Sequence, residues 1–131
     1  MIIGVGCDIC NQTRIEKVAT KYPERFISKI LTNAEMAQMQ SRSDKMAFLA
    51  KRFAAKEAIY KAISAHISPP PSWHDAEILN NEAGRPLVTL SERCHNALGK
   101  LAGGNNQNIA YHLSLSDDAP FVMAVFIVSQ S

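Results

Sequence analysis

Three consecutive prolines, Pro69 to Pro71, lie near the middle of this 131-residue chain. A run of prolines cannot lie inside a helix or a central strand, because each proline lacks the backbone N–H that these structures use. The segment from Ser68 to Ser72 is therefore predicted to be a stiff connector. It divides the chain into two unequal parts that are each too small for a stable core, so we expect one domain over residues 1–131.

Before the connector the sequence predicts one strand followed by helices. Alternating apolar residues predict a strand over residues 2–9, with Cys7 on the face that meets the core. A helix is expected to begin near Asn11 and to run past Val18. The sequence from Thr32 to Glu35 has the pattern of a capping box and predicts a short second helix. Residues 44–65 form the longest helical candidate.

After the connector the sequence predicts mainly strands. Strands are expected at residues 76–79, 86–90, 109–115 and 121–128, and Ser91 is the expected N-cap of a helix that ends at Gly103 and Gly104. Together with the first half, these elements predict an α+β fold. We expect a mainly antiparallel sheet packed with one long and several short helices.

Composition excludes several classes of protein. Hydrophobic residues make up 47% of the chain, enough for a real core, and the net charge of +2 does not indicate nucleic-acid binding. No apolar run reaches the roughly 18 residues of a membrane span, and no signal-peptide pattern is present. Three cysteines do not form a disulfide framework. We therefore expect a reduced, cytoplasmic protein that binds neither nucleic acid nor membrane.

Asp8 is the first candidate for chemistry. It shares a strand face with Gly4 and Gly6, and a face cleared of side chains suits a ligand that lies close to the backbone. Alternatively, Asp8 ends the strand and caps the helix that begins near Asn11. Both interpretations fit the sequence.

Glu57 and Lys61 are the second candidate, one turn apart on the long helix. Ala54 and Ala58 beside them leave room for another group. A carboxylate and an ammonium at this spacing are also a common helix-stabilising pair. If Asp8 and Glu57 meet, two carboxylates and a lysine suit Mg²⁺ bound to a diphosphate, because Mg²⁺ takes one or two protein carboxylates and completes its shell with phosphate oxygens and water.

Four blocks of sequence resemble one enzyme family. The segment from Phe48 to Ala58, followed by Lys61, resembles the signature helix of holo-[acyl-carrier-protein] synthases, the AcpS-type 4′-phosphopantetheinyl transferases. The family's other motifs match three further segments, which are residues 4–9 with Arg14 and Ile15, residues 75–78 with 84–86, and residues 112–117 with 124–125. The blocks occur in the family's order and span nearly the whole chain.

The resemblance implies a specific reaction. Such enzymes transfer the 4′-phosphopantetheine group of coenzyme A to a serine of an apo acyl carrier protein and release 3′,5′-ADP, a step in fatty-acid and lipid biosynthesis. It implies that Asp8 and Glu57 bind Mg²⁺ and that Lys61 contacts the coenzyme A phosphates. The family is typically a homotrimer with active sites at subunit interfaces.

Further contacts to coenzyme A and to the carrier are predicted. Arg52 and Arg85 are candidates for phosphate binding because guanidinium groups bind phosphate well, and Pro86 is a candidate for packing on adenine. Basic and apolar residues near the first helix are expected to dock an acidic carrier protein, rather than to form an ordinary amphipathic surface. These docking candidates are Arg14, Val18, Tyr22 and Arg25.

The chain departs from the family at three places. Ser64-Ala65-His66 replaces a Gly-Thr-Gly-like segment that brings backbone N–H groups near phosphate. Asp117 and Asp118 stand where many members carry a histidine. Lys56 falls within the apolar stripe of its helix, and its place in the motif predicts a positive charge near the site.

Two other functions are compatible with parts of the sequence. Cys7 and Cys10 form a C-x-x-C spacing, which in some proteins is a redox or metal-binding motif. The altered segment after the long helix is also compatible with a module that binds carrier proteins without catalysis.

Overall fold

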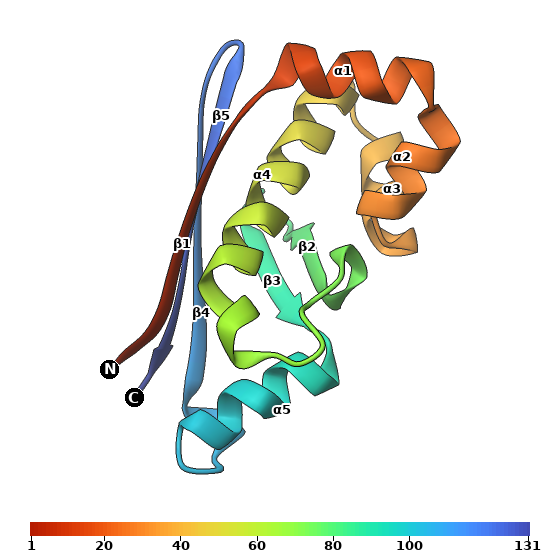
Figure 1. Cartoon of the computed structure of the whole chain (residues 1–131). Coiled ribbons are helices and arrows are strands. Elements are labelled where there is room, and N and C mark those ends of the chain that lie inside the picture. The colour runs from red at the N-terminus through yellow and green to blue at the C-terminus, as the bar shows by residue number, and fades with distance from the viewer.

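The computed structural model describes residues 1–131 and has an α+β architecture, as predicted (Figure 1). The strands are β1 (Ile2–Asn11), β2 (Ala76–Asn80), β3 (Pro86–Leu90), β4 (Ile109–Asp118) and β5 (Phe121–Gln130). The helices are α1 (Gln12–Lys21), α2 (Pro23–Ile30), α3 (Asn33–Gln40), α4 (Lys45–Ile63) and α5 (Glu92–Leu101). Three short 3-10 turns are η1 (Ser64–His66), η2 (Trp73–Asp75) and η3 (Asn106–Asn108).

The main sheet has three antiparallel strands in the order β1-β5-β4, and α4 runs across its inner face (Figure 1). The inner side chains of β5 are fully buried against that helix, and they are Val122, Ala124, Phe126 and Val128. A separate antiparallel hairpin, β2-β3, packs on α4 beside α3. The predicted mainly antiparallel arrangement with one long helix is therefore confirmed.

β1 lies against the backbone of α4. Its glycines face the helix because a side chain would not fit there. A Cβ on Gly4 would lie 2.2 Å from the carbonyl oxygen of Ala62. The apolar residues of the strand consequently point outward, and Val5 is 56% exposed. Cys7 is exposed as well, so the prediction that it faces the core is wrong. We expected a ligand on the glycine face of β1, but the backbone of α4 occupies that face.

The Lys56 side chain joins α4 to three other elements, α2, α3 and η2. Its Nζ donates hydrogen bonds to Glu35 Oε1 at 2.6 Å, to the Ile30 carbonyl at 2.7 Å and to the Trp73 carbonyl at 3.0 Å. The other oxygen of Glu35 accepts from the Ile78 amide at 2.8 Å. Burial lowers the pKa of Lys56, and the charge of Glu35 opposes that effect. The positive charge that the motif predicted near the site is therefore neutralised by Glu35 in a buried ion pair.

Several local predictions hold at the termini of the helices. The Asn11 side chain caps α1 by accepting from the Thr13 amide, and the Thr32 capping box opens α3. The sequence did not predict α2, which begins at Pro23 because proline suits the first turn of a helix. The connector contains no helix or strand between Ile67 and Ser72. None of the helices has both the length and the hydropathy to cross a membrane.

Candidate active site

Lys61 on α4 reaches across to β1. Its Nζ lies 3.1 Å from Asp8 Oδ1 and donates to the Cys7 carbonyl at 3.1 Å. Lys61 therefore pairs with Asp8, and the simple helix pair with Glu57 does not form. The capping role considered for Asp8 is filled by Asn11. The carboxylate of Asp8 is thus left facing α4, where its side chain is only 13% exposed.

Asp8 and Glu57 face the same groove between β1, α1 and α4, which we call the docking groove. Its volume is about 500 Å³. Burial raises the pKa of Glu57, the charge of Asp8 raises it further, and the charge of Lys61 opposes both effects. The two carboxylates are therefore near enough to repel each other. A bound cation would relieve that repulsion.

The side chains available as ligands limit which metal ions could bind at this site. No group of three or more His, Cys, Asp or Glu side chains converges anywhere in the chain. A structural zinc site needs four protein ligands, so the structure does not fit one. Two carboxylates do fit Mg²⁺, which takes its remaining ligands from phosphate and water.

The cysteines do not form a redox pair. Cys7 lies on the outer side of the sheet, whereas the Cys10 thiol lies 3.5 Å from the Ala50 carbonyl. Burial and the charge of Asp8 raise the pKa of Cys10 to about 11, which keeps the thiol protonated at neutral pH. A reactive C-x-x-C motif needs a thiolate. The redox interpretation of Cys7 and Cys10 is therefore not supported.

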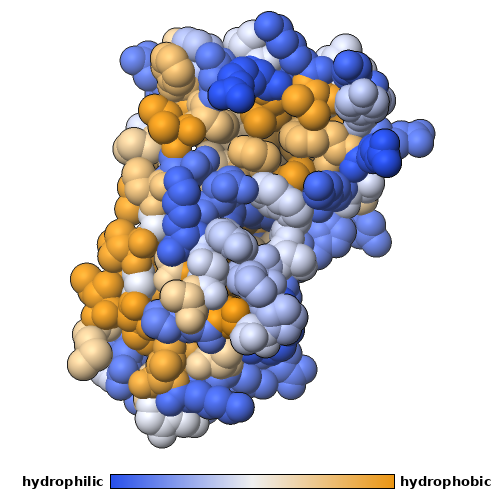
Figure 2. All heavy atoms as spheres, in the orientation of Figure 1, coloured by the Kyte–Doolittle hydropathy of each residue, from blue (hydrophilic) through white to orange (hydrophobic).

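The docking groove joins the carboxylates to the predicted carrier-binding residues. Arg14 and Val18 on α1 line it together with Phe26 and Phe53. Figure 2 shows apolar surface hollowed between polar residues over the α1–α2 corner of the molecule. Tyr22, which joins the two helices, is 48% exposed, and Arg25 in the first turn of α2 is also exposed. The groove is apolar with a basic rim.

The predicted coenzyme-binding arginines lie apart from Asp8 and Glu57. Arg52 is buried, donates to the Ile78 carbonyl at 2.8 Å and stacks on the Phe48 ring at 4.2 Å. Burial lowers its pKa to about 10, so it stays charged at neutral pH. Arg85 is exposed beside Pro86.

Arg52 and Pro86 line a second cavity of about 470 Å³, which we call the basic hollow. Its other polar and basic side chains include Arg42, Lys51, Ser114 and Ser116. Arg42, in the loop before α4, and Lys51 on α4 were not predicted from the sequence, since surface lysines and arginines are usually only solvated. Their ion pairs with Asp44 at 2.7 Å and Asp117 at 3.0 Å hold them at the rim.

The outer face of the three-stranded sheet is apolar and uncovered along β1 and β5, whereas β4 contributes His112, Ser114 and Ser116 to it. Ile9 is 65% exposed and Met123, its partner in register, is 41% exposed. The next rows of the same face carry Cys7 beside Val125 and Val5 beside Ile127. Figure 2 shows apolar surface along the edge of the molecule where β1 runs. A contiguous exposed apolar surface of this kind is typical of an association surface.

Comparisons of sequence and of structure match this chain, over nearly its whole length, to one family of enzymes. The model of the 4′-phosphopantetheinyl transferase superfamily matches residues 4–124. The chain is similar to the holo-[acyl-carrier-protein] synthase of Vibrio cholerae serotype O1, with 38% identity over 130 residues that cover 99% of each protein. It is 37% identical over 128 residues to the protein of the same name from Bartonella henselae, covering 98% of this chain and 96% of that one. The crystal structure of a holo-(acyl-carrier-protein) synthase from Bacillus anthracis in complex with CoA (3′,5′-ADP) has a TM-score of 0.77 and 32% identity, and covers 100% of this chain and 99% of that chain.

Proposed function

Because the chain belongs to the 4′-phosphopantetheinyl transferase superfamily, it moves the 4′-phosphopantetheine group from coenzyme A to an apo acyl carrier protein, and we propose that Asp8, Glu57 and Lys61 are its catalytic centre. The observation that carries this assignment is the convergence of β1 and α4. Asp8 and Lys61 are in contact at 3.1 Å, and Glu57 shares the groove with Asp8.

Lys61 and the two carboxylates have different roles in the transfer. The carrier serine attacks the β-phosphorus of coenzyme A, an Oγ–P bond forms, the P–O–P bond breaks, and 3′,5′-ADP leaves. Lys61, a point charge that is half exposed, stabilises the negative charge on the phosphate oxygens. Asp8 and Glu57 are the carboxylates nearby that are available to accept the serine proton.

Asp8 and Glu57 also suit a divalent cation, which we propose is Mg²⁺. The mutual repulsion of the two carboxylates and the shortage of other donors fit an ion that relies on phosphate and water for most of its ligands. When bound, Mg²⁺ would neutralise charge that develops on the diphosphate.

The docking groove is the proposed site for the carrier protein. Its apolar floor and the basic side chains of Arg14 and Arg25 complement a partner with an acidic helix, and the exposed Val18 and Tyr22 supply apolar contacts. The groove ends at Asp8 and Glu57, so a carrier bound there would present its serine to the catalytic centre.

We further propose a homotrimer assembled through the outer face of the sheet. That face is apolar and uncovered along β1 and β5, and assembly would bury Val5, Ile9 and Met123. Within one chain, Arg52 and Pro86 are separated from Asp8 and Glu57, because they line different cavities. A neighbouring copy could bring its basic hollow, with Arg85 nearby, to the catalytic centre and hold the nucleotide end of coenzyme A. The three free cysteines suit the reducing cytoplasm as the place of this step of lipid biosynthesis.

Mass spectrometry of an apo acyl carrier protein tests the proposed centre directly. After incubation with this protein, coenzyme A and Mg²⁺, the carrier should gain the mass of one phosphopantetheine group, and a chelator should abolish the gain. Activity that survives complete chelation would contradict the metal role. Carrier binding without any mass gain, over a panel of carriers, would instead indicate a non-catalytic binding module.

A further inference from the structure

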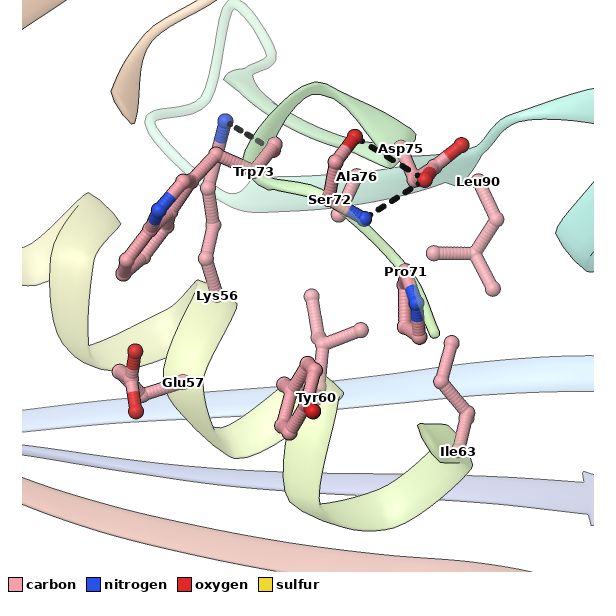
Figure 3. A pocket seen from close by; sticks show the side chains of 11 residues that line it. Lys56, Glu57, Tyr60, Ile63, Pro71, Ser72, Trp73, Asp75, Ala76 and Leu90 are labelled. Carbon is pink, nitrogen blue, oxygen red and sulfur yellow. Dashed lines mark hydrogen bonds between the residues drawn. The ribbon is translucent and has the colours of Figure 1, made fainter. Parts of the chain in front are cut away.

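A third, smaller cavity opens beside Glu57, between α4, the proline connector and β3 (Figure 3). Its volume is about 210 Å³, and six of its eleven lining residues are hydrophobic. We call it the apolar pocket. Its walls are formed chiefly by Ile59, Tyr60, Ile63, Pro71, Trp73 and Leu90.

Glu57 is the residue that the apolar pocket and the docking groove share. Phe53, which lines the docking groove, packs on Trp73, which lines the apolar pocket, with ring centroids 5.2 Å apart. The pocket therefore begins beside the carboxylate that we assign to the metal and the diphosphate. A group that enters it must be connected closely to that diphosphate.

Apart from Glu57 at its entrance, the charged residues of the pocket wall are already paired within the protein. The Lys56 ammonium is neutralised by Glu35 at 2.6 Å. The Asp75 carboxylate accepts hydrogen bonds from Ser91, Ser72 and Arg93. With these groups satisfied, the pocket favours an uncharged, apolar group and disfavours a phosphate.

The connector wall is held in place by Arg93. Its guanidinium donates to the Pro69 carbonyl at 2.8 Å, to the Pro70 carbonyl at 3.2 Å and to Asp75 Oδ2 at 2.7 Å. The Ser72 amide donates to the same Asp75 oxygen at 2.7 Å. The connector wall is therefore preformed, which reduces the cost of binding a small group.

We propose that the apolar pocket binds the pantoyl end of the transferred arm, an inference that rests on the proposed function. In coenzyme A, the β-phosphate is bonded to a CH₂ group that carries a carbon with two methyl groups. This is the uncharged apolar part of the substrate closest to the diphosphate. The adenosine end carries a 3′-phosphate, for which the pocket has no available cation. Tyr60, Pro71 and Trp73 are then specificity-determining residues.

Trp73 is the single tryptophan of the chain, so its fluorescence reports on the pocket directly. Titration of the protein with coenzyme A should change the emission of Trp73. Titration with 3′,5′-ADP, which lacks the arm, should leave it unchanged although calorimetry detects binding. Equal changes with both ligands, or no change when calorimetry shows that coenzyme A is bound, would overturn the assignment.

Kinetics with an analogue of coenzyme A that lacks the two methyl groups give a second test. Each buried methyl group contributes roughly fourfold in affinity, so with two methyl groups the wild type should favour coenzyme A over the analogue about fifteenfold in kcat/KM. The Tyr60→Ala variant removes a wall residue that is 44% exposed and should reduce this preference to about twofold. Tyr60→Phe should keep the preference, and so should Leu101→Ala, which removes a similarly exposed side chain of α5.

The two hypotheses fail in different ways. If the wild type neither binds coenzyme A nor modifies a carrier, the proposed function is wrong, and the pocket assignment falls with it. If the wild type transfers the arm but Tyr60→Ala keeps the full preference for coenzyme A over the analogue, the pocket assignment alone is wrong.

Discussion

Gly6 lies directly against the backbone of Ala58, since a Cβ on Gly6 would come within 1.8 Å of the Ala58 carbonyl oxygen. This contact brings β1 to backbone distance from α4. Asp8, two residues further along the strand, is thereby placed beside the turn of α4 that carries Lys61. The absence of a side chain at Gly6 is thus what allows the proposed catalytic centre to form.

Substitution of Gly6 by alanine should separate the strand from the helix. We expect Gly6→Ala to lower the free energy of unfolding by about 3 kcal/mol, because neither backbone can yield without breaking its own hydrogen bonds. Urea denaturation measures this loss. The control is Gly84→Ala, which has φ +81° but open space around it, and it should cost only about 1 kcal/mol. Equal losses in the two variants would show that the close approach has no special importance.

Removal of either proposed metal ligand should abolish turnover in a folded protein. Asp8→Ala and Glu57→Ala should each reduce kcat by about 100-fold or more, equivalent to about 3 kcal/mol of transition-state stabilisation. Turnover of the carrier is measured over a range of Mg²⁺ concentrations, and circular dichroism checks the fold. A variant that keeps the wild-type rate at limiting Mg²⁺ would show that its carboxylate does not bind the metal.

Local signals in the sequence were reliable, whereas the partners of charged residues were not predictable. The Thr32 capping box and the proline connector depend on neighbours in the chain, and both were predicted correctly. The alternation in β1 revealed two faces but not which one is buried, because α4 selects the glycine face by its backbone. Lys56 lies 21 residues from Glu35 in the chain, so nothing local indicated that its charge is satisfied in the core.

The family resemblance and the structure supply different parts of the site. The motif identified Asp8, Glu57 and Lys61, and the structure brings them together. It also shows that Lys61 pairs with Asp8 and not with Glu57, a choice that helix spacing cannot predict. The apolar pocket escaped prediction because its wall joins Tyr60 to Trp73 across the connector.

Loss of Arg14 should weaken docking of the carrier and leave coenzyme A binding intact. An exposed charge pair contributes about 1 kcal/mol, so Arg14→Ala should raise KM for the carrier about fivefold. The effect should shrink as salt increases, since screening weakens the attraction in the wild type. The control is Lys100→Ala on α5, at the opposite end of the molecule from α1 (Figure 1). A change confined to KM for coenzyme A would contradict the docking role.

Breaking the buried pair should destabilise the fold far more than breaking a surface pair. Lys56→Met leaves Glu35 buried without its cation and should cost about 4 kcal/mol in the free energy of unfolding. Lys51→Met on the same helix breaks a partly exposed pair with Asp117 and should cost less than about 1 kcal/mol. Urea denaturation of both variants tests the difference. A small loss for Lys56→Met would indicate that Lys56 does not hold the core together.

The free energy of unfolding should depend on pH through the Asp75 carboxyl group. Burial alone would raise its pKa, but hydrogen bonds from Ser91, Ser72 and Arg93 together hold the pKa well below its usual range. A carboxyl with a depressed pKa stabilises the fold above its unfolded value, near pH 4, and this contribution is lost as pH falls through the lower folded pKa. Asp75→Asn keeps the size of the side chain but does not titrate. The stability advantage of the wild type over Asp75→Asn should therefore be constant between pH 5 and pH 7 and about 1 kcal/mol smaller at pH 3. Denaturation curves at these three pH values measure it, and an advantage that is unchanged or larger at pH 3 would show that the carboxylate is not stabilised in the folded protein.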